Sequence, residues 1–203
     1  MMNSTAKNVI TLTIITVIAG ALLGYVYDLT KGPIADAKEQ SRQEAYKKVF
    51  NEASTFEDMD SKSEDDWVTQ LSEAGLENDS IDNILCAKDA GGSLLGYVIL
   101  VTSHEGYGGD INISMGIAND GTVKGVEILS ISETPGLGMN ADTDEFKSRF
   151  ADKNVASFSY TKTGAKADYE IDALSGATIT TRAMTNAVNA GLVAFKTIGG
   201  SEE

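Results

Sequence analysis

A run of 20 residues without a charged side chain, residues 8–27, constrains this chain more than any other feature. The run, NVITLTIITVIAGALLGYVY, is rich in Ile, Leu and Val. At about 1.5 Å per helical residue it would span about 30 Å, the thickness of a bilayer core. A cleaved signal peptide is the alternative, but its apolar region is usually only about 7–15 residues long and follows a basic segment. Because only Lys7 precedes this run, we predict a retained helix in the lipid bilayer.

The charges that flank this run leave its orientation open. Lys7 lies on one side, and Lys31 and Lys38 follow on the other. The positive-inside rule gives no preference with so few charges. A short N-terminus inside the cell, with the larger part of the chain outside, is therefore a default that needs independent support.

The chain as a whole is acidic, with 30 Asp and Glu against 16 Lys and Arg among 203 residues, a net charge of −14. Because such a chain repels polyanions, the charge argues against nucleic acid as a partner. A single cysteine, Cys86, excludes an internal disulfide and a multi-cysteine metal or iron–sulfur site. The single histidine, His104, excludes a multi-histidine site from this chain alone. We therefore expect no metal site.

Three parts follow from these patterns: a membrane anchor at 1–28, a connecting helix and acidic segment at 29–79, and a folded domain at 80–203. Thr30 can cap a connecting helix that begins near Pro33, since proline is tolerated in a first helical turn. Residues 51–79 are polar and acidic. We expect them to form a solvated face or a loose segment, and a cation-binding carboxylate cluster is the alternative.

From Ser80 onward the pattern changes to that of strands. Glycines between two apolar runs predict a hairpin over 81–103, and Asn-Asp-Gly at 119–121 predicts a second over 111–132. The remaining segments predict a short helix, two strand pieces and a final helix, over 141–152, 155–161, 167–174 and 179–198. The predicted fold class is α+β, with an antiparallel sheet and flanking helices behind a single transmembrane helix.

The first candidate binding segment is DALSGATITT, residues 172–181, which enters the final helix. Ser175 can cap that helix, and Gly176 and Ala177 leave the backbone accessible. The first N–H groups of a helix lack intrahelical partners and favour a phosphate. Four hydroxyl groups and one cation can assist the helix start, those of Ser175, Thr178, Thr180, Thr181 and Arg182. The alternative is an ordinary capped helix that starts with threonines.

Two further segments follow predicted strands. In SETPGLGM, residues 132–139, Pro-Gly specifies a turn, and the flanking side chains suit a flat heteroaromatic ring with polar edges. In GYGGD, residues 106–110, three glycines permit close backbone approach or a tight bend. His104, beside this loop, is interpreted as an ordinary surface histidine. A plain turn is the alternative for each segment.

Four motifs occur in order behind the membrane helix: TKGPI at 30–34, GYGGDI at 106–111, SETPGLG at 132–138 and DALSGAT at 172–178. This arrangement resembles the G subunit of the Rnf electron-transport complex. It also resembles the related C subunit of sodium-translocating NADH:quinone oxidoreductase. The short chain and the SETPGLG motif favour the Rnf protein.

The resemblance implies a flavoprotein in which FMN is bound covalently through its phosphate to a threonine hydroxyl, here Thr178. A flavin transferase would use FAD and Mg²⁺ and recognise Asp172, Ser175, Gly176 and Ala177. Around the phosphate we expect Ser175, Gly176, Ala177, Thr180 and Thr181. Around the flavin ring we expect Glu133, Thr134, Gly136 and Leu137, together with Tyr107 and Gly108.

The resemblance also implies a setting. Rnf complexes couple electron flow between reduced ferredoxin and NAD⁺ to the pumping of Na⁺ or H⁺. This chain would be a single-pass protein of the cell membrane that relays electrons on the extracytoplasmic side, beside subunits with iron–sulfur centres and further flavins. It would be a relay without catalytic residues of its own. The alternatives are a flavoprotein of the sodium-translocating NADH:quinone oxidoreductase type and a non-redox membrane-tethered scaffold.

Overall fold

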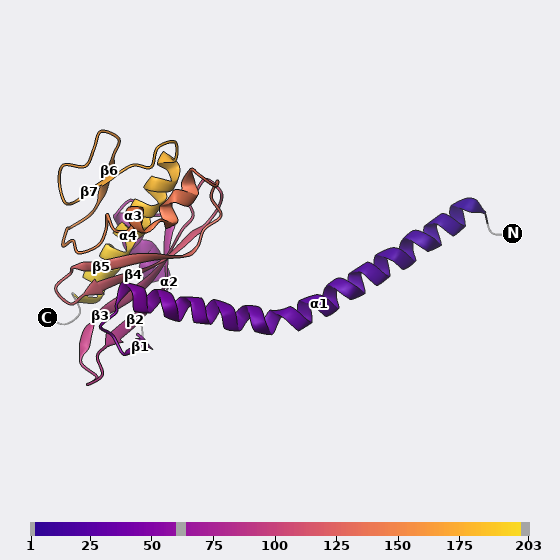
Figure 1. Ribbon diagram of the computed structural model, residues 1–203, viewed down its shortest axis with the longest axis horizontal. Helices are drawn as coiled ribbons and strands as arrows, with labels where there is room; N and C mark the ends of the chain where they lie inside the picture. Colours follow the sequence, from indigo (N-terminus) through magenta and orange to yellow (C-terminus); the bar gives the residue numbers. More distant parts are fainter. Residues whose placement is uncertain (1–2, 60–63, 200–203) are drawn as a thin grey trace. The chain divides into compact units, whose positions relative to one another are not determined.

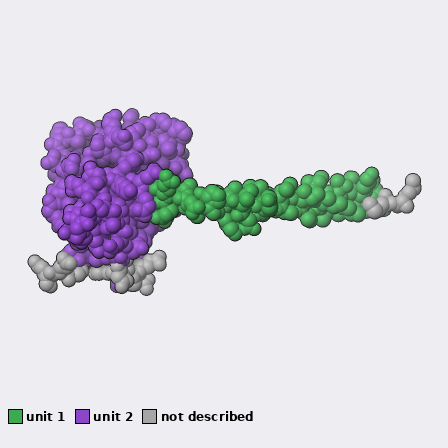
Figure 2. Space-filling model, turned by 60° about the horizontal axis from the view of Figure 1, so that its bottom comes forward, with its two compact units in different colours: residues 1–42 green, residues 43–203 purple. Residues whose placement is uncertain are grey.

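The computed structural model describes residues 3–59 and 64–199. The chain divides into two compact units, residues 1–42 and 43–203 (Figure 2). The first unit consists of most of α1 (Ser4–Val49), a 46-residue helix that contains the uncharged run. By length and composition α1 can cross a membrane, and none of its most apolar stretch is buried inside the protein. This agrees with the predicted membrane helix.

The connecting segment does not start a second helix, so that prediction was wrong. Thr30 lies inside α1, where its hydroxyl donates to the carbonyl oxygen of Val26 at 2.9 Å instead of capping a helix. Pro33 is also inside α1. A proline removes one backbone donor, but the Ala, Lys, Glu and Gln residues after it are strong helix formers. Their propensity lets the helix continue as far as Val49.

The second unit is built on a five-stranded antiparallel sheet in the order β1-β2-β3-β4-β5 (Figure 1). Both predicted hairpins are confirmed, as β2–β3 and β4–β5. Gly92 and Gly121 have φ of +83° and +86° in their turns, a conformation that glycine adopts without strain. The strands are β1 (Thr55–Asp58), β2 (Asp79–Lys88), β3 (Leu94–Ser103), β4 (Ile111–Ala118) and β5 (Val123–Ser130).

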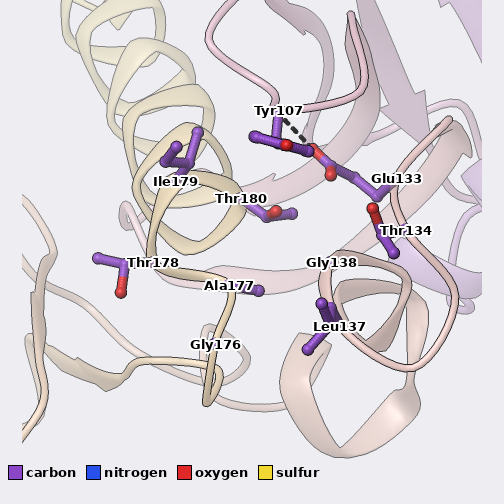
Figure 3. Close-up of a pocket in the computed structure, with 10 residues that line it drawn as sticks. All are labelled: Tyr107, Glu133, Thr134, Leu137, Gly138, Gly176, Ala177, Thr178, Ile179 and Thr180. Carbon is purple, nitrogen blue, oxygen red and sulfur yellow. Dashed lines mark hydrogen bonds between the residues drawn. The ribbon is translucent and has the colours of Figure 1, made fainter.

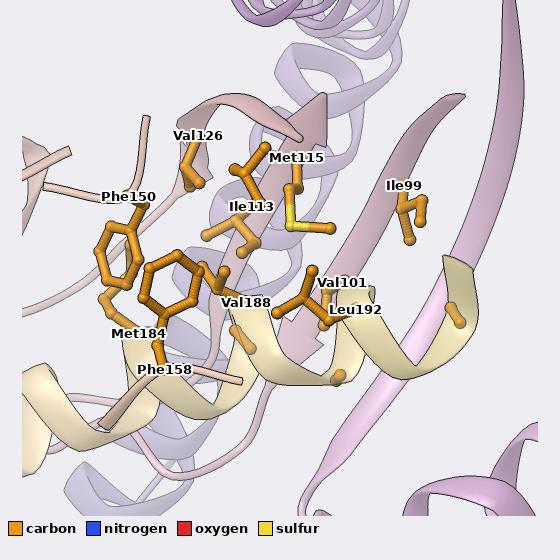
Figure 4. Packing of buried hydrophobic residues seen from close by; sticks show 14 of the residues in the cluster. Ile99, Val101, Ile113, Met115, Val126, Phe150, Phe158, Met184, Val188 and Leu192 are labelled. Atoms are coloured by element: carbon orange, nitrogen blue, oxygen red, sulfur yellow. The ribbon is translucent and has the colours of Figure 1, made fainter. Parts of the chain in front are cut away.

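One face of the sheet is covered by α4 (Thr178–Gly199), which confirms the predicted final helix. Alternate residues of a strand point to the same face, so Ile99 and Val101 of β3 meet α4 together with Ile113 and Met115 of β4 (Figure 4). Gly191 permits this close approach, because a Cβ there would lie 2.5 Å from the Met115 methyl carbon. The helix supplies the large apolar side chains of Met184, Val188, Leu192 and Ile198 to this cluster.

The opposite face of the sheet packs against the last residues of α1, which belong to the second unit. Tyr46, Val49 and Phe50 are buried there. Opposite them lie the other strand residues, Leu85, Ala87, Val98 and Leu100. The sheet is therefore buried on both faces.

The acidic segment is more ordered than the sequence predicted. It contributes β1 and α2 (Glu64–Glu73), and Trp67 and Leu71 of α2 are buried in the same core cluster as α4. These two residues are four apart and so share one helix face. Glu57 and Asp58 of β1 are exposed, as expected of a solvated face. Asp60 lies outside the described residues.

The remaining elements of the second unit are short. The helix predicted at 141–152 is instead a 3₁₀ helix, η1 (Gly138–Asp142), and a short helix, α3 (Asp144–Lys147). Thr143 separates them, and its hydroxyl accepts from the amide of Phe146 as an N-cap. The two predicted strand pieces form a small parallel pair, β6 (Ser159–Thr161) and β7 (Glu170–Asp172).

Candidate functional site

The three segments singled out in the sequence meet around one open cavity of about 590 Å³ (Figure 3). They are the β3–β4 loop, the turn between β5 and η1, and the turn from β7 into α4. Residues separated by more than 70 positions therefore share one site. The lining consists of Tyr107, Glu133, Thr134, Leu137, Gly138, Gly176, Ala177, Thr178, Ile179 and Thr180.

The turn into α4 places Thr178 at the first position of the helix. The amide of Ala177 donates to the carbonyl of Leu174 at 3.1 Å, and Gly176 has φ of +73° within this turn. A turn of this kind favours glycine at its third position. The amides of the first helical turn have no preceding carbonyl to bind, so they present partial positive charge beside the Thr178 hydroxyl.

Thr181 stabilises this turn from the protein interior and does not line the cavity. Its side chain is fully buried. The hydroxyl donates to the carbonyl of Ala177 at 2.9 Å and accepts from the amide of Leu174 at 3.0 Å. Both capacities of the hydroxyl are thus used by the backbone, which fixes the start of α4.

Ser175 and Asp172 also lie outside the cavity lining. Ala177, not Ser175, precedes the first helical residue, so the predicted Ser175 cap was wrong; the turn at Gly176 displaces the serine to an exposed position. Asp172 ends β7, and its carboxylate accepts from the amide of Ala165 at 2.5 Å. Asp172 therefore orders the loop before the site.

Glu133 and Thr180 form a polar floor. The Glu133 side chain is buried, and its Oε1 accepts from the Tyr107 amide at 2.7 Å (dashed line in Figure 3). A Cβ on Gly138 would lie 2.6 Å from Oε2 of Glu133 and 2.6 Å from Oγ1 of Thr180. The two oxygens therefore converge on a point that only glycine leaves open.

The turn before η1 is set by Thr134 and Gly136. The Thr134 carbonyl accepts from the amides of Leu137 and Met139 at 3.1 and 3.2 Å. Gly136 has φ of +75° and serves the turn without lining the cavity. Leu137 is carried into the lining, as the Pro-Gly turn predicted.

The β3–β4 loop supplies one part of the rim. A Cβ on Gly108 would collide with the Ser132 carbonyl oxygen, so this glycine serves backbone packing and does not line the cavity. Tyr107 does line it and is 72% exposed. His104 is half-exposed and pairs with Asp110, with 2.9 Å between Nδ1 and Oδ1, which agrees with a surface histidine.

Most of the predicted site residues are thus brought together, and two lining residues were missed. Gly138 lies inside the quoted SETPGLG motif but was not singled out, because its role depends on Glu133 and Thr180 approaching it in space. Ile179 is 43% exposed at the start of α4, and its place directly after Thr178 was its only signal in the sequence. Among the ten lining residues Glu133 is the one charged side chain.

The arrangement can hold a ligand that is anionic at one end and planar at the other. The start of α4 suits the anion, the floor suits a hydrogen-bonding ring edge, and Tyr107, Leu137 and Ile179 supply apolar surface. Within residues 3–59 and 64–199 no cluster of three or more His, Cys, Asp or Glu could hold a metal ion.

Comparison with known proteins identifies the family of this chain. Residues 106–193 match the FMN-binding domain, and residues 1–49 match the RnfG N-terminal region. The G subunit of the ion-translocating oxidoreductase complex of Methanosarcina acetivorans is 32% identical over 186 residues, covering 90% of each chain. The chain belongs to the RnfG family. This confirms the resemblance drawn from the four motifs.

Two other RnfG relatives show a comparable similarity. The G subunit of the proton-translocating ferredoxin:NAD(+) oxidoreductase complex of Clostridium ljungdahlii is 30% identical, covering 94% of this chain and 91% of that one. The G subunit of the Na(+)-translocating ferredoxin:NAD(+) oxidoreductase complex of Acetobacterium woodii is 30% identical, covering 92% and 89%. The relatives thus include members of complexes named for different ions.

Two solved structures share the fold. NqrC of Shewanella oneidensis superposes with a TM-score of 0.50 at 24% identity, over 59% of each chain. The C subunit of the Na(+)-translocating NADH-quinone reductase from Parabacteroides distasonis gives a TM-score of 0.53 at 18% identity, over 74% of this chain and 80% of that one. The predicted α+β fold class is therefore confirmed.

Proposed function

We propose that this chain is the electron-carrying RnfG component of a membrane complex that couples electron transfer between ferredoxin and NAD⁺ to the translocation of Na⁺ or H⁺. Membership of the RnfG family supports this function. The two relatives named above belong to ferredoxin:NAD(+) oxidoreductase complexes, one named for protons and one for Na⁺. The coupling ion is accordingly left as either of the two.

The observation that carries the proposal is the meeting of Thr178 with a polar floor in one cavity inside the segment matched to the FMN-binding domain. FMN has a phosphate at one end and a planar ring with polar edges at the other. The first amides of α4 suit the phosphate, and Glu133 and Thr180 suit the ring edge. A cavity of about 590 Å³ lies within the size range of small-molecule sites.

We further assign Thr178 as the covalent attachment point. Its hydroxyl would lose a proton and form the new P–O bond to the FMN phosphate of FAD, while AMP leaves with the electrons of the broken bond. A flavin transferase would provide FAD and Mg²⁺. Ser175 and Gly176 are exposed beside Thr178, so they are accessible to such an enzyme although Ser175 is outside the cavity lining.

The other residues would hold the ring. Glu133 can accept a hydrogen bond from a ring N–H, and the Thr180 hydroxyl can donate to a ring carbonyl. Leu137, Ile179 and Tyr107 can cover apolar parts of the ring and exclude water. Bound FMN would supply the redox chemistry, so the chain needs no acid–base catalyst of its own.

The proposed setting is a single-pass membrane protein. Residues 1–28 would be the anchor, 29–79 the connection, and 80–203 the FMN-binding domain on the extracytoplasmic side. The length and apolar composition of α1 support the anchor. Covalent attachment is useful on that side, because a flavin lost from the cell would not be recovered. The partners would be subunits that carry iron–sulfur centres and further flavins.

The test uses the full chain coexpressed with the transferase, run on a denaturing gel and read by flavin fluorescence and intact mass. The wild type should carry FMN, and Thr178→Val should carry none. The matched control is Thr185→Val, which removes another buried hydroxyl of α4 outside the cavity lining and should remain flavinylated. Fluorescence that survives Thr178→Val would place the attachment elsewhere, and a wild type without flavin from native membranes would overturn the redox function.

A further inference from the structure

Arg182 lies one helical turn beyond Thr178 on α4. Side chains four residues apart share a face of a helix, and each leans back toward the helix N-terminus. The surface that a long side chain at position 182 covers is therefore the turn that carries the Thr178 hydroxyl. The Arg182 side chain is 47% exposed, so it has room to change its partner.

The present partner of Arg182 holds it loosely. Its Nη2 lies 3.6 Å from Oε1 of Glu105, too long for a hydrogen bond. The other oxygen of Glu105 accepts from the side-chain amide of Asn186 at 2.6 Å. Glu105 would thus keep a hydrogen bond if Arg182 moved away, and partly exposed ion pairs contribute little stability.

The residues that line the cavity include no positively charged side chain. Glu133 is the charged residue of the lining, and it is negative. A phosphodiester at Thr178 would add a second negative charge, whereas the helix start offers only partial positive charge. In α4 the basic residues are Arg182 and Lys196, and Lys196 is in the last turn. Arg182 is therefore the cation of α4 within reach of Thr178.

We propose that Arg182 is the charge partner of the phosphodiester that joins FMN to Thr178, and that it exchanges Glu105 for this phosphate when the flavin is attached. The proposal rests on the proposed covalent flavinylation. A guanidinium remains charged at every physiological pH and matches two phosphate oxygens in a bidentate geometry. Arg182 is thereby a positioning residue for the flavin phosphate.

The exchange makes a prediction that a purely structural ion pair does not. If Arg182 and Glu105 only stabilise the fold together, Arg182→Gln and Glu105→Gln should have the same effect. If Glu105 competes with the phosphate for Arg182, the two variants should act in opposite directions. Arg182→Lys keeps the charge but loses the bidentate geometry, so it should restore part of the effect.

The experiment flavinylates the full chain in detergent with the transferase, FAD and Mg²⁺, and records the ³¹P NMR shift of the phosphodiester and the rise in Tm on flavinylation. Arg182→Gln should move the resonance, reduce the rise in Tm, and slow flavin attachment about tenfold, the loss of roughly one charge-assisted hydrogen bond. Glu105→Gln, which removes the competing carboxylate, should increase the rise in Tm. Lys196→Gln, which removes a contact to the Ala156 carbonyl at the other end of α4, is the matched control and should match the wild type.

An unchanged resonance and an unchanged rise in Tm in Arg182→Gln would overturn the proposal, and so would Glu105→Gln behaving like Arg182→Gln. A wild type that shows no fluorescent band on a denaturing gel would overturn the proposed flavinylation itself. The two failures are therefore distinguishable.

Discussion

The two long helices of this chain, α1 and α4, are both rich in apolar residues but bury them in different ways. The apolar stretch of α1 is exposed all round, whereas α4 turns a face of small and large apolar residues into the core. A helix that is apolar on every side needs an apolar environment on every side, while a one-sided helix needs only one neighbour. The environment of α1 must therefore come from outside this chain, and that of α4 is the sheet.

Replacing Met184 of α4 should have the largest effect on this comparison. Met184 is fully buried against the sheet, so Met184→Ala leaves a cavity and should cost about 3 kcal/mol of unfolding free energy. Ile14→Ala in α1, where the side chain is 53% exposed, should leave the stability of the second unit unchanged. Urea unfolding of the full chain in detergent measures both. Equal losses would mean that α1 contributes to the same cooperative unit.

The second prediction compares two lysines that approach Glu127, Lys147 of α3 and Lys48 in the last turn of α1. Lys147 of α3 is nearly buried and its Nζ lies 2.8 Å from Oε2 of Glu127. Burial lowers the pKa of Lys147, but the carboxylates around it outweigh burial, so its pKa is raised overall. Lys147→Gln leaves Glu127 poorly compensated and should cost about 2 kcal/mol. Lys48 reaches the same oxygen only at 3.8 Å from an exposed position, so Lys48→Gln should cost less than about 0.5 kcal/mol by the same urea assay.

A smaller effect should appear as a dependence on pH. Burial, the main cause, raises the pKa of Asp79 to about 6. A carboxylate whose pKa is higher in the folded state favours folding at low pH, and that stability is lost as pH rises through the folded value. Asp79→Asn should therefore stabilise the second unit by about 1–2 kcal/mol at pH 8, with the gain disappearing between about pH 6 and pH 4.

Urea titrations at pH 8, 6 and 4 check this prediction. Asp36→Asn, at an exposed position of α1 in the first unit, is the matched control and should leave the stability of the second unit unchanged. A gain from Asp79→Asn that is constant with pH would show that ionisation of Asp79 is not its cause.

The sequence predicted those parts of the structure that depend on neighbouring residues. Asn119-Asp120-Gly121 specified a hairpin turn locally, and the Pro135-Gly136 pair marked the turn before η1. The predicted start of a connecting helix near Pro33 was wrong for a related reason. A proline at 33 is a local signal to stop, and the helix formers that follow it decided otherwise.

The errors at the site arise from contacts across the fold. Thr181 and Thr180 look equivalent in the sequence, but only the bend at Gly176 brings the Leu174 amide onto the Thr181 hydroxyl. The role of Gly138 depends on its approach to Glu133 of the same turn and to Thr180 of α4, which is 42 positions away in the sequence. No rule of spacing along the chain predicts such contacts, so the sequence alone could not distinguish the residues that line the cavity from their neighbours.

The floor of the cavity, formed by Glu133 and Thr180, is open because Gly138 has no side chain. Thr178 and the opening at Gly138 belong to different segments. If FMN is attached to Thr178 as we propose, its attachment and the seating of its ring therefore depend on different parts of the chain. A methyl group added at position 138 would leave the cofactor tethered but exclude its ring from the floor. The flavin ring of such a chain would be attached but not held in one orientation. Comparing its electron-transfer rate with that of the wild type would separate the effect of ring orientation from that of proximity.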